Sequence, residues 1–318
     1  MSAAKKTQKE KKTDKERPPA SKAVELLKEK NIDVVIREIQ EQSGIVGRER
    51  ELRNIVLARI SGRHVVIEGG VGVGKTTLAQ AIANYFDQSF IRIDGDERYT
   101  EAKLVGHFEP PLVVEKGWKR ESFVPGPLTL AMERGSVLFI NEANRLIEGT
   151  QNVLLPALDE GLITIPKLDP VTAEDGFFVV ATQNPESYIG TTVLSEALKD
   201  RFVWVRLKKQ TFEEEMTIVA SEAKQPLDSD IVRIATKIGR ATRQHPDIRR
   251  GASVRGAIDF CRILSLVSKL EKETIIDIAI MTLATKIELE DGVERTVEDV
   301  ITEICEKVLS AEEESDFL

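Results

Sequence analysis

Residues 64–76 read HVVIEGGVGVGKT, and this stretch decides the fold of the chain. Its first five residues form a short, mostly apolar run that is typical of a buried strand. The glycine-rich remainder matches the pattern G-x-x-x-x-G-K-[ST], and a segment of helical period follows at residues 75–86. In such a strand–loop–helix unit, backbone N–H groups and the helix N-terminus surround phosphate oxygens. The stretch therefore predicts a phosphate-binding loop within an α/β domain.

Two side chains of this loop bring specific chemistry. Lys75 is expected to reach the β- and γ-phosphates of ATP, and the Thr76 hydroxyl is expected to ligate Mg²⁺. An ordinary glycine-rich turn is the alternative, and the strand and helix on either side argue against it. ATP and Mg²⁺ are therefore the expected cofactors. The residues predicted to bind the nucleotide here are Gly69, Gly70, Val71, Gly72, Val73, Gly74, Lys75, Thr76 and Thr77.

Strand-like and helical segments alternate around the loop. This rhythm predicts right-handed crossovers and a five-stranded parallel sheet with helices on both faces. The predicted strands are residues 64–68, 90–94, 136–140, 177–182 and 203–207. After residue 209 the strand signals stop, and helical periods predict a small all-helical lid domain. Its helices are expected at residues 211–223, 230–243, 253–270, 274–288 and 297–310.

These patterns divide the chain into four parts. Residues 1–20 are predicted to be a disordered basic tail, 21–209 the nucleotide-binding α/β domain, 210–310 the lid and 311–318 an acidic tail. Ahead of the first strand, helical periods occur at residues 21–42 and 48–60.

The charge of the chain is distributed unevenly. Residues 1–19 carry seven basic and three acidic side chains, a net charge of +4, so the remainder must carry −12 to give the formal total of −8. An acidic body argues against general nucleic-acid binding, which needs lysine and arginine to replace phosphate counterions. Two distant cysteines, no apolar leader and no long apolar stretch predict a cytoplasmic protein without a membrane span.

Polar residues end the third and fourth predicted strands. Residues 137–142 read VLFINE, and Glu142 is positioned to orient the water that attacks the γ-phosphate, unless it only caps a helix. Asn141 stands where such a strand usually carries aspartate. It can bond a metal-bound water but brings no charge, which puts metal affinity and turnover in question. Asn184 can bond the γ-phosphate or the water, or can merely form a turn before Pro185.

Several motifs resemble the MoxR family of AAA+ ATPases. They occur in the family's order between about residue 44 and about residue 266: NEANR at 141–145, TQNVLLPALDE at 150–160, ATQNP at 181–185, EALKDRF at 196–202 and GASVR at 251–255. The resemblance implies a helix-2-insert AAA+ fold, usually a hexameric ring with ATP bound between neighbours. Val254 departs from the proline usual there. The gas-vesicle GvpN branch and the Rubisco-activating CbbQ branch are similar as well, so the branch stays open.

The resemblance also assigns roles to residues outside the loop. Arg201 resembles the arginine finger that reaches a neighbour's γ-phosphate, and its alternative is a salt bridge with Asp200 or another acid. Arg255 resembles the sensor-2 arginine that couples the lid to the nucleotide, and its alternative is a structural helix arginine. Ile45 and Val46 resemble the element that packs against adenine, although as apolar residues they could equally belong to the core.

A long connection separates the second and third predicted strands. In this insert, residues 105–127, the run KGWK at 116–119 is predicted to be a hairpin tip. Trp118 could grip a partner near the pore of a ring, or could pack against its own domain.

Three functions compete at this stage. The first is a remodelling chaperone that hydrolyses ATP and acts on a protein partner, for which the resemblance suggests a protein with a von Willebrand factor A domain. The second, motivated by Asn141, is a nucleotide-gated assembly scaffold with little turnover. The third, a DNA-loading ATPase, is disfavoured by the acidic body and the lack of a basic-aromatic groove.

Overall fold

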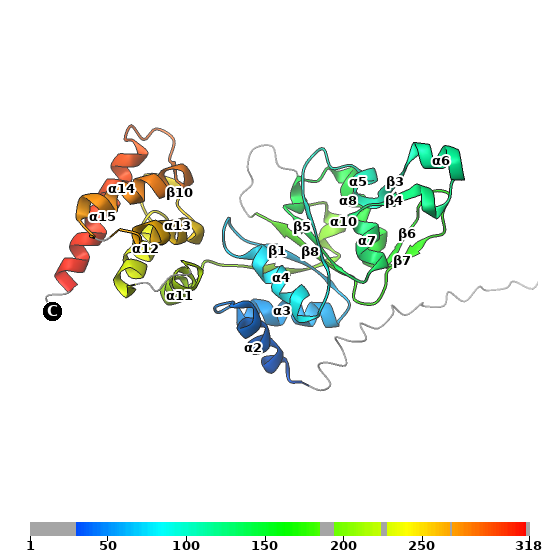
Figure 1. Cartoon of the computed structure of the whole chain (residues 1–318), viewed down its shortest axis with the longest axis horizontal. Coiled ribbons are helices and arrows are strands. Elements are labelled where there is room, and N and C mark those ends of the chain that lie inside the picture. The colour runs from blue at the N-terminus through cyan, green and yellow to red at the C-terminus, as the bar shows by residue number, and fades with distance from the viewer. Residues whose placement is uncertain (1–29, 185–193, 224–227, 268, 316–318) are drawn as a thin grey trace, which may run out of the picture.

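A computed structural model describes residues 30–184, 194–223, 228–267 and 269–315, and Figure 1 shows an α/β part beside a helical part. The α/β part is built on five strands in the order β2-β5-β8-β1-β9. All four pairings between neighbours are parallel, as the alternation of the sequence predicts. The strands are β1 (His64–Glu68), β2 (Phe90–Asp94), β5 (Val137–Asn141), β8 (Phe178–Gln183) and β9 (Phe202–Arg206).

Helices cover both faces of this sheet. Because side chains alternate along a strand, Val65 and Ile67 face one apolar core while Val66 faces the other. The first core is completed by α2 (Ile32–Ser43), α3 (Glu49–Ile60) and α4 (Lys75–Tyr85). The second is completed by α5 (Glu101–Val105), α7 (Pro127–Glu133), α9 (Leu154–Asp159) and α10 (Glu196–Lys199), with α8 (Glu148–Asn152) beside them. Burial on both faces explains the nearly continuous apolar runs of the strands.

The first described helix starts later than the sequence predicts. A helix over residues 21–42 was expected, but α2 begins at Ile32 and ends at Ser43. Asn31 has an extended backbone, and its side chain accepts a hydrogen bond from the Asp33 N–H. An asparagine in this position caps a helix and therefore marks its start. Residues 21–29 lie outside the described part of the chain.

The insert also differs from the predicted hairpin. Two short antiparallel strands, β3 (Gly106–Phe108) and β4 (Phe123–Pro125), form its base. Between them, α6 (Pro110–Lys116) stands where a strand of the hairpin was expected, so the tip at residues 116–119 is a helix end and not a strand turn. Proline at the first helical positions favours this start, and Gly117, with φ of 79°, ends the helix. A second small ribbon, β6 (Leu162–Ile163) with β7 (Val171–Thr172), precedes β8.

Five helices around a separate apolar core follow the sheet. They are α11 (Phe212–Ala223), α12 (Ser229–Ala241), α13 (Val254–Leu264), α14 (Lys272–Leu283) and α15 (Val297–Ser315). A two-stranded ribbon of β10 (Ile248–Arg250) and β11 (Glu288–Leu289) joins them, which the sequence does not predict. Consequently α14 ends at Leu283, earlier than expected, because Glu288 pairs as a strand with Arg250. The helix α13 also ends earlier than expected, at Leu264.

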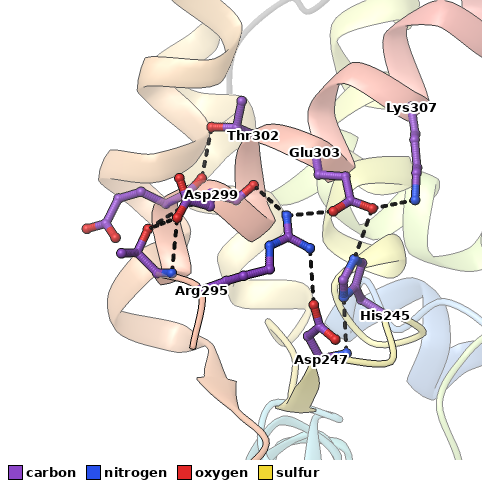
Figure 2. A network of polar contacts seen from close by, with 9 residues as sticks. His245, Asp247, Arg295, Asp299, Thr302, Glu303 and Lys307 are labelled. Atoms are coloured by element: carbon purple, nitrogen blue, oxygen red, sulfur yellow. Dashed lines mark hydrogen bonds and ion pairs between the residues drawn. The ribbon is translucent and has the colours of Figure 1, made fainter. Parts of the chain in front are cut away.

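A polar cluster fastens α15 to the loop before β10 (Figure 2). Arg295 donates to Asp247 at 3.1 Å and pairs with Glu303 at 2.6 Å. Hydrogen bonds from Lys307 and Arg295 lower the pKa of Glu303 to about 2. The carboxylate is therefore charged over the whole physiological range, and the last helix stays tied to the ribbon.

A buried ion pair joins α11 to the end of α12. Glu215 is 1% exposed and accepts from Arg243 Nη1 at 2.9 Å, with Arg240 Nη1 at 3.2 Å. Removing one member of a buried pair leaves uncompensated charge, which is strongly destabilising.

Glu215→Ala is therefore expected to lower the unfolding free energy of the helical part by about 3 kcal/mol. Urea denaturation of the full chain, followed by far-ultraviolet circular dichroism, measures this loss. Glu213→Ala is the control, because Glu213 lies on the same helix with an exposed side chain. Equal denaturation midpoints for the two variants would show that the pair contributes nothing.

Candidate nucleotide site

The loop between β1 and α4 borders a cavity of about 680 Å³ at the carboxyl ends of the strands. Gly72 and Gly74 have φ of 76° and 92°, a left-handed conformation that glycine adopts without steric cost. The loop therefore curls at the N-terminus of α4, where N–H groups and the helix dipole favour an anion. The cavity also brings together most residues predicted to act on a nucleotide: Lys75, Thr76, Asn141, Glu142, Asn184 and Arg255.

Lys75 connects the loop to Asn184, the residue that follows β8. Its Nζ donates to the Gly70 carbonyl at 2.9 Å and to Asn184 Oδ1 at 2.7 Å. Burial lowers the pKa of Lys75 to about 8, an effect that Glu142 opposes and Arg255 reinforces. The lysine is thus a partly buried cation whose charge is sensitive to pH and to nearby anions.

Glu142 follows β5 directly and faces the same cavity. One carboxylate oxygen accepts from Asn184 Nδ2 at 3.2 Å and the other from Arg145 Nη1 at 3.0 Å. Its backbone has φ of 52°, which is uncommon for a residue with a side chain and recurs at functional sites. The Glu142 N–H donates to the Thr182 hydroxyl at 2.9 Å, so β8 supports this conformation.

Asn141 is held from both sides. Its Nδ2 donates to Asp94 Oδ1 at 2.8 Å, and its Oδ1 accepts from the Thr182 hydroxyl at 3.1 Å. Arg92 in turn donates to Asp94 at 2.6 Å, and this bond lowers the pKa of the aspartate. Asp94, Arg92 and Thr182 were not predicted from the sequence as site residues. For Asp94 and Thr182 the available signal was their place near strand ends, which a parallel sheet brings to one edge.

The two arginines singled out by resemblance occupy different places. Arg255 reaches the cavity from the first turn of α13. Arg201 does not line it: its Nε donates to Asp159 at 2.6 Å, and it also bonds the Ala197 carbonyl. Within this chain, Arg201 therefore makes the salt bridge that the sequence left as its alternative. Its role at a neighbour's site stays a prediction.

The two residues expected to pack against adenine also lie off the cavity lining. Ile45 is partly buried against the core of α2, α3 and α4. Val46 accepts from Gln210 Nε2 at 2.7 Å through its carbonyl. Gln42 and Ser43, at the end of α2, line the cavity instead. The adenine role of Ile45 and Val46 stays a prediction.

The sheet order, the loop after β1 and the polar strand ends define a P-loop ATPase of the AAA+ class. Residues 64–202 match the AAA domain of the dynein-related subfamily. The gas vesicle ATPase GvpN of Haloferax mediterranei is 30% identical over 259 residues, which cover 74% of each chain. YeaC of Bacillus subtilis is 30% identical over 241 residues, covering 67% of this chain and 72% of YeaC. This chain belongs to the MoxR-like AAA+ ATPases, as its motifs predict.

A solved structure agrees with the fold. A protein of Cytophaga hutchinsonii provisionally assigned as an ATPase superimposes with a TM-score of 0.50 at 21% identity. The match covers 89% of this chain and 98% of that one. Among the described residues, no helix has the length and apolar character needed to cross a membrane.

The position of Lys75 makes nucleotide affinity sensitive to pH. Protonated Lys75 attracts the phosphates, and a bound polyphosphate raises its pKa. Affinity for a non-hydrolysable ATP analogue should therefore be constant below pH 8 and fall above it. The loss should approach about tenfold per pH unit. Calorimetric titration between pH 7 and pH 9.5 measures this loss of affinity, because the range spans the lowered pKa of Lys75. Lys75→Arg keeps its charge and should remove the dependence. An equal decline of affinity in the Lys75→Arg variant would show that the pH dependence comes from another group.

Proposed function

We propose that this protein hydrolyses ATP with Mg²⁺ as a homo-hexameric ring and uses the energy to remodel a protein partner. The observation that carries the proposal is the chain of hydrogen bonds from Lys75 through Asn184 to Glu142. The side-chain amide of Asn184 bonds Lys75 through its oxygen and Glu142 through its nitrogen. It therefore joins the lysine that attracts phosphate to the carboxylate that can accept a proton from water. Phosphate binding and proton acceptance, the two tasks that hydrolysis requires, are therefore supported within a single cavity.

The lining of the cavity suits Mg²⁺. Thr76 contributes a hydroxyl, Asn141 a carboxamide oxygen and Glu142 a carboxylate, all oxygen donors of the kind that this cation prefers. When bound, the ion would neutralise charge on the β- and γ-phosphates. Thr76 would hold it directly, and Asn141 would bond one of its waters.

The residues of this chain would share the remaining work. Lys75 and the N–H groups of the loop orient the phosphates, and Asn184 positions the γ-phosphate or the water. Glu142 then orients the attacking water and takes its proton. Arg255 lies in the lid, so its contact with the cavity links the lid to the state of the nucleotide.

A ring would complete the site. Arg201 lies between α10 and β9, away from the cavity of its own chain, and its side chain is 28% exposed. An arginine there would act on the nucleotide of a neighbour, where it stabilises the charge of the transferring phosphoryl group. Its bond to Asp159 would hold it in place until the neighbour binds ATP.

The insert offers a surface for a protein partner. Trp118 packs edge-to-face on Phe108, with ring centroids 4.8 Å apart, yet stays 57% exposed. Val114 on α6 is 89% exposed. A braced aromatic beside an exposed aliphatic side chain suits contact with a protein, and the family resemblance suggests a partner with a von Willebrand factor A domain.

A second candidate is a nucleotide-gated assembly scaffold with little turnover. Asn141 favours it, because the carboxamide supplies no charge beside the metal. The relative GvpN is named as a gas vesicle ATPase, which supports the use of ATP under either candidate function.

Phosphate release tests the proposal against this alternative. Lys75→Ala is expected to lose tight ATP binding, and Glu142→Gln should bind ATP but lose at least about a hundredfold in turnover. A wild-type rate equal to that of Glu142→Gln would reject the motor and leave the scaffold.

Mixing variants tests the shared site. Arg201→Ala should bind ATP normally but hydrolyse it about a thousandfold more slowly. Mixtures with Glu142→Gln should regain activity, because some interfaces then combine an intact Glu142 with an intact Arg201. Lys199→Ala, an exposed change on α10, serves as the control and should keep wild-type activity. Activity that never recovers on mixing would place the whole site within one chain.

A further inference from the structure

The ends of β2 and β5 place a carboxylate next to Asn141. Asp94 is the register partner of Asn141 in these parallel strands. Its Oδ1 accepts from Asn141 Nδ2 at 2.8 Å and from Arg92 Nη2 at 2.6 Å. An acid thus lies one strand away from the position where the strand-end aspartate is missing.

The hydrogen bonds allow only one orientation of the Asn141 carboxamide. The Thr182 hydroxyl accepts from the Glu142 N–H at 2.9 Å, so its own hydrogen is directed to Asn141 Oδ1 at 3.1 Å. The carboxylate of Asp94 can only accept, so it requires the Nδ2 side of the amide. Flipping the amide would set its oxygen against the carboxylate of Asp94, which has no hydrogen to donate.

This orientation has a direction within the sheet. Thr182 lies on β8, between β5 and the loop-bearing β1, whereas Asp94 lies on β2 at the far side. The carboxamide oxygen is therefore turned toward β8 and β1, and its nitrogen is turned away from them. The phosphate loop, with Lys75 and Thr76, lines the cavity from the side of the oxygen, while Arg92 on β2 lines it from the side of the nitrogen.

We propose that Asp94 is a positioning residue for the metal side of the site: it fixes Asn141 with its oxygen toward the phosphates and supplies the nearby negative charge. The inference rests on the proposed Mg²⁺-dependent hydrolysis. Asp94 acts through Asn141 and lies one strand further from the loop. It would therefore change the metal affinity without being a metal ligand itself. Outer partners of this kind change metal affinity without touching the metal.

The inference changes what substitution of Asn141 should do. Asn141→Asp alone would set two carboxylates about as close as the present 2.8 Å contact, and like charges at that distance repel. In the double variant Asp94→Asn/Asn141→Asp, the new carboxamide nitrogen would donate to the new carboxylate, and the carboxamide oxygen would take the place of Asp94 Oδ2, which accepts from Arg92 Nε at 3.2 Å. The double variant should therefore bind metal better than either single variant.

Electron paramagnetic resonance of Mn²⁺, as a probe for Mg²⁺, measures this directly in the complex with a non-hydrolysable ATP analogue. Asp94→Asn is expected to weaken Mn²⁺ binding by about tenfold. Asn141→Asp should not exceed the wild type, and the double variant should recover at least wild-type affinity. Glu97→Gln is the control for a general loss of charge, because Glu97 is an exposed acid three residues further along.

Analogue affinity without metal should be the same in all five proteins, which shows that fold and cavity are intact. Wild-type affinity for Mn²⁺ in Asp94→Asn would overturn the role of Asp94, as would a double variant no better than Asn141→Asp. A wild-type complex that holds no more Mn²⁺ than the free analogue would instead remove the proposed metal dependence, and this inference with it.

Discussion

The contact of 2.7 Å between Lys75 Nζ and Asn184 Oδ1 is the interaction on which the site depends. It exists because β1 and β8 pair in parallel, which brings their carboxyl ends to one edge of the sheet. From Asn184 the hydrogen bonds continue to Glu142 on the end of β5. Two apolar cores hold these strands in register, so the buried side chains on both faces determine where the polar strand ends lie.

The helical part contacts the same loop and so can respond to it. A side chain at Gly72 would lie 2.6 Å from the Cβ of Ser253, the residue that precedes α13, and Arg255, two residues further along, reaches the cavity. The Gln210 amide bonds the Val46 carbonyl, which fastens the lid to the segment after α2. Within the helical part, the buried Glu215 pairs with Arg240 and Arg243 and so joins α11 to the end of α12.

Much of the site could be predicted from sequence because its signals are local. The loop at residues 69–76 and the strand ending in Glu142 are contiguous motifs, and the apolar runs were sufficient to predict five strands. Asp94 was missed because its link to Asn141 depends on which strands pair, a relation between residues 47 apart in the chain. The sequence shows that Asn141 brings no charge to the metal side of the site, and the structure adds the carboxylate of Asp94 at 2.8 Å from its amide nitrogen. The helix in the insert was missed because Pro110-Pro111 and Gly117 can mark either a turn or the two ends of a helix.

The central claim is that Lys75, Asn184 and Arg255 converge on one triphosphate. A crystal structure of the complex with Mg²⁺ and a non-hydrolysable ATP analogue tests it most directly. The expected result is a γ-phosphate within hydrogen-bonding distance of Lys75 Nζ and Asn184, with Arg255 of the same chain in contact and Glu142 facing the in-line water position. A nucleotide bound with its γ-phosphate beyond the reach of Lys75 and Asn184 would contradict the account.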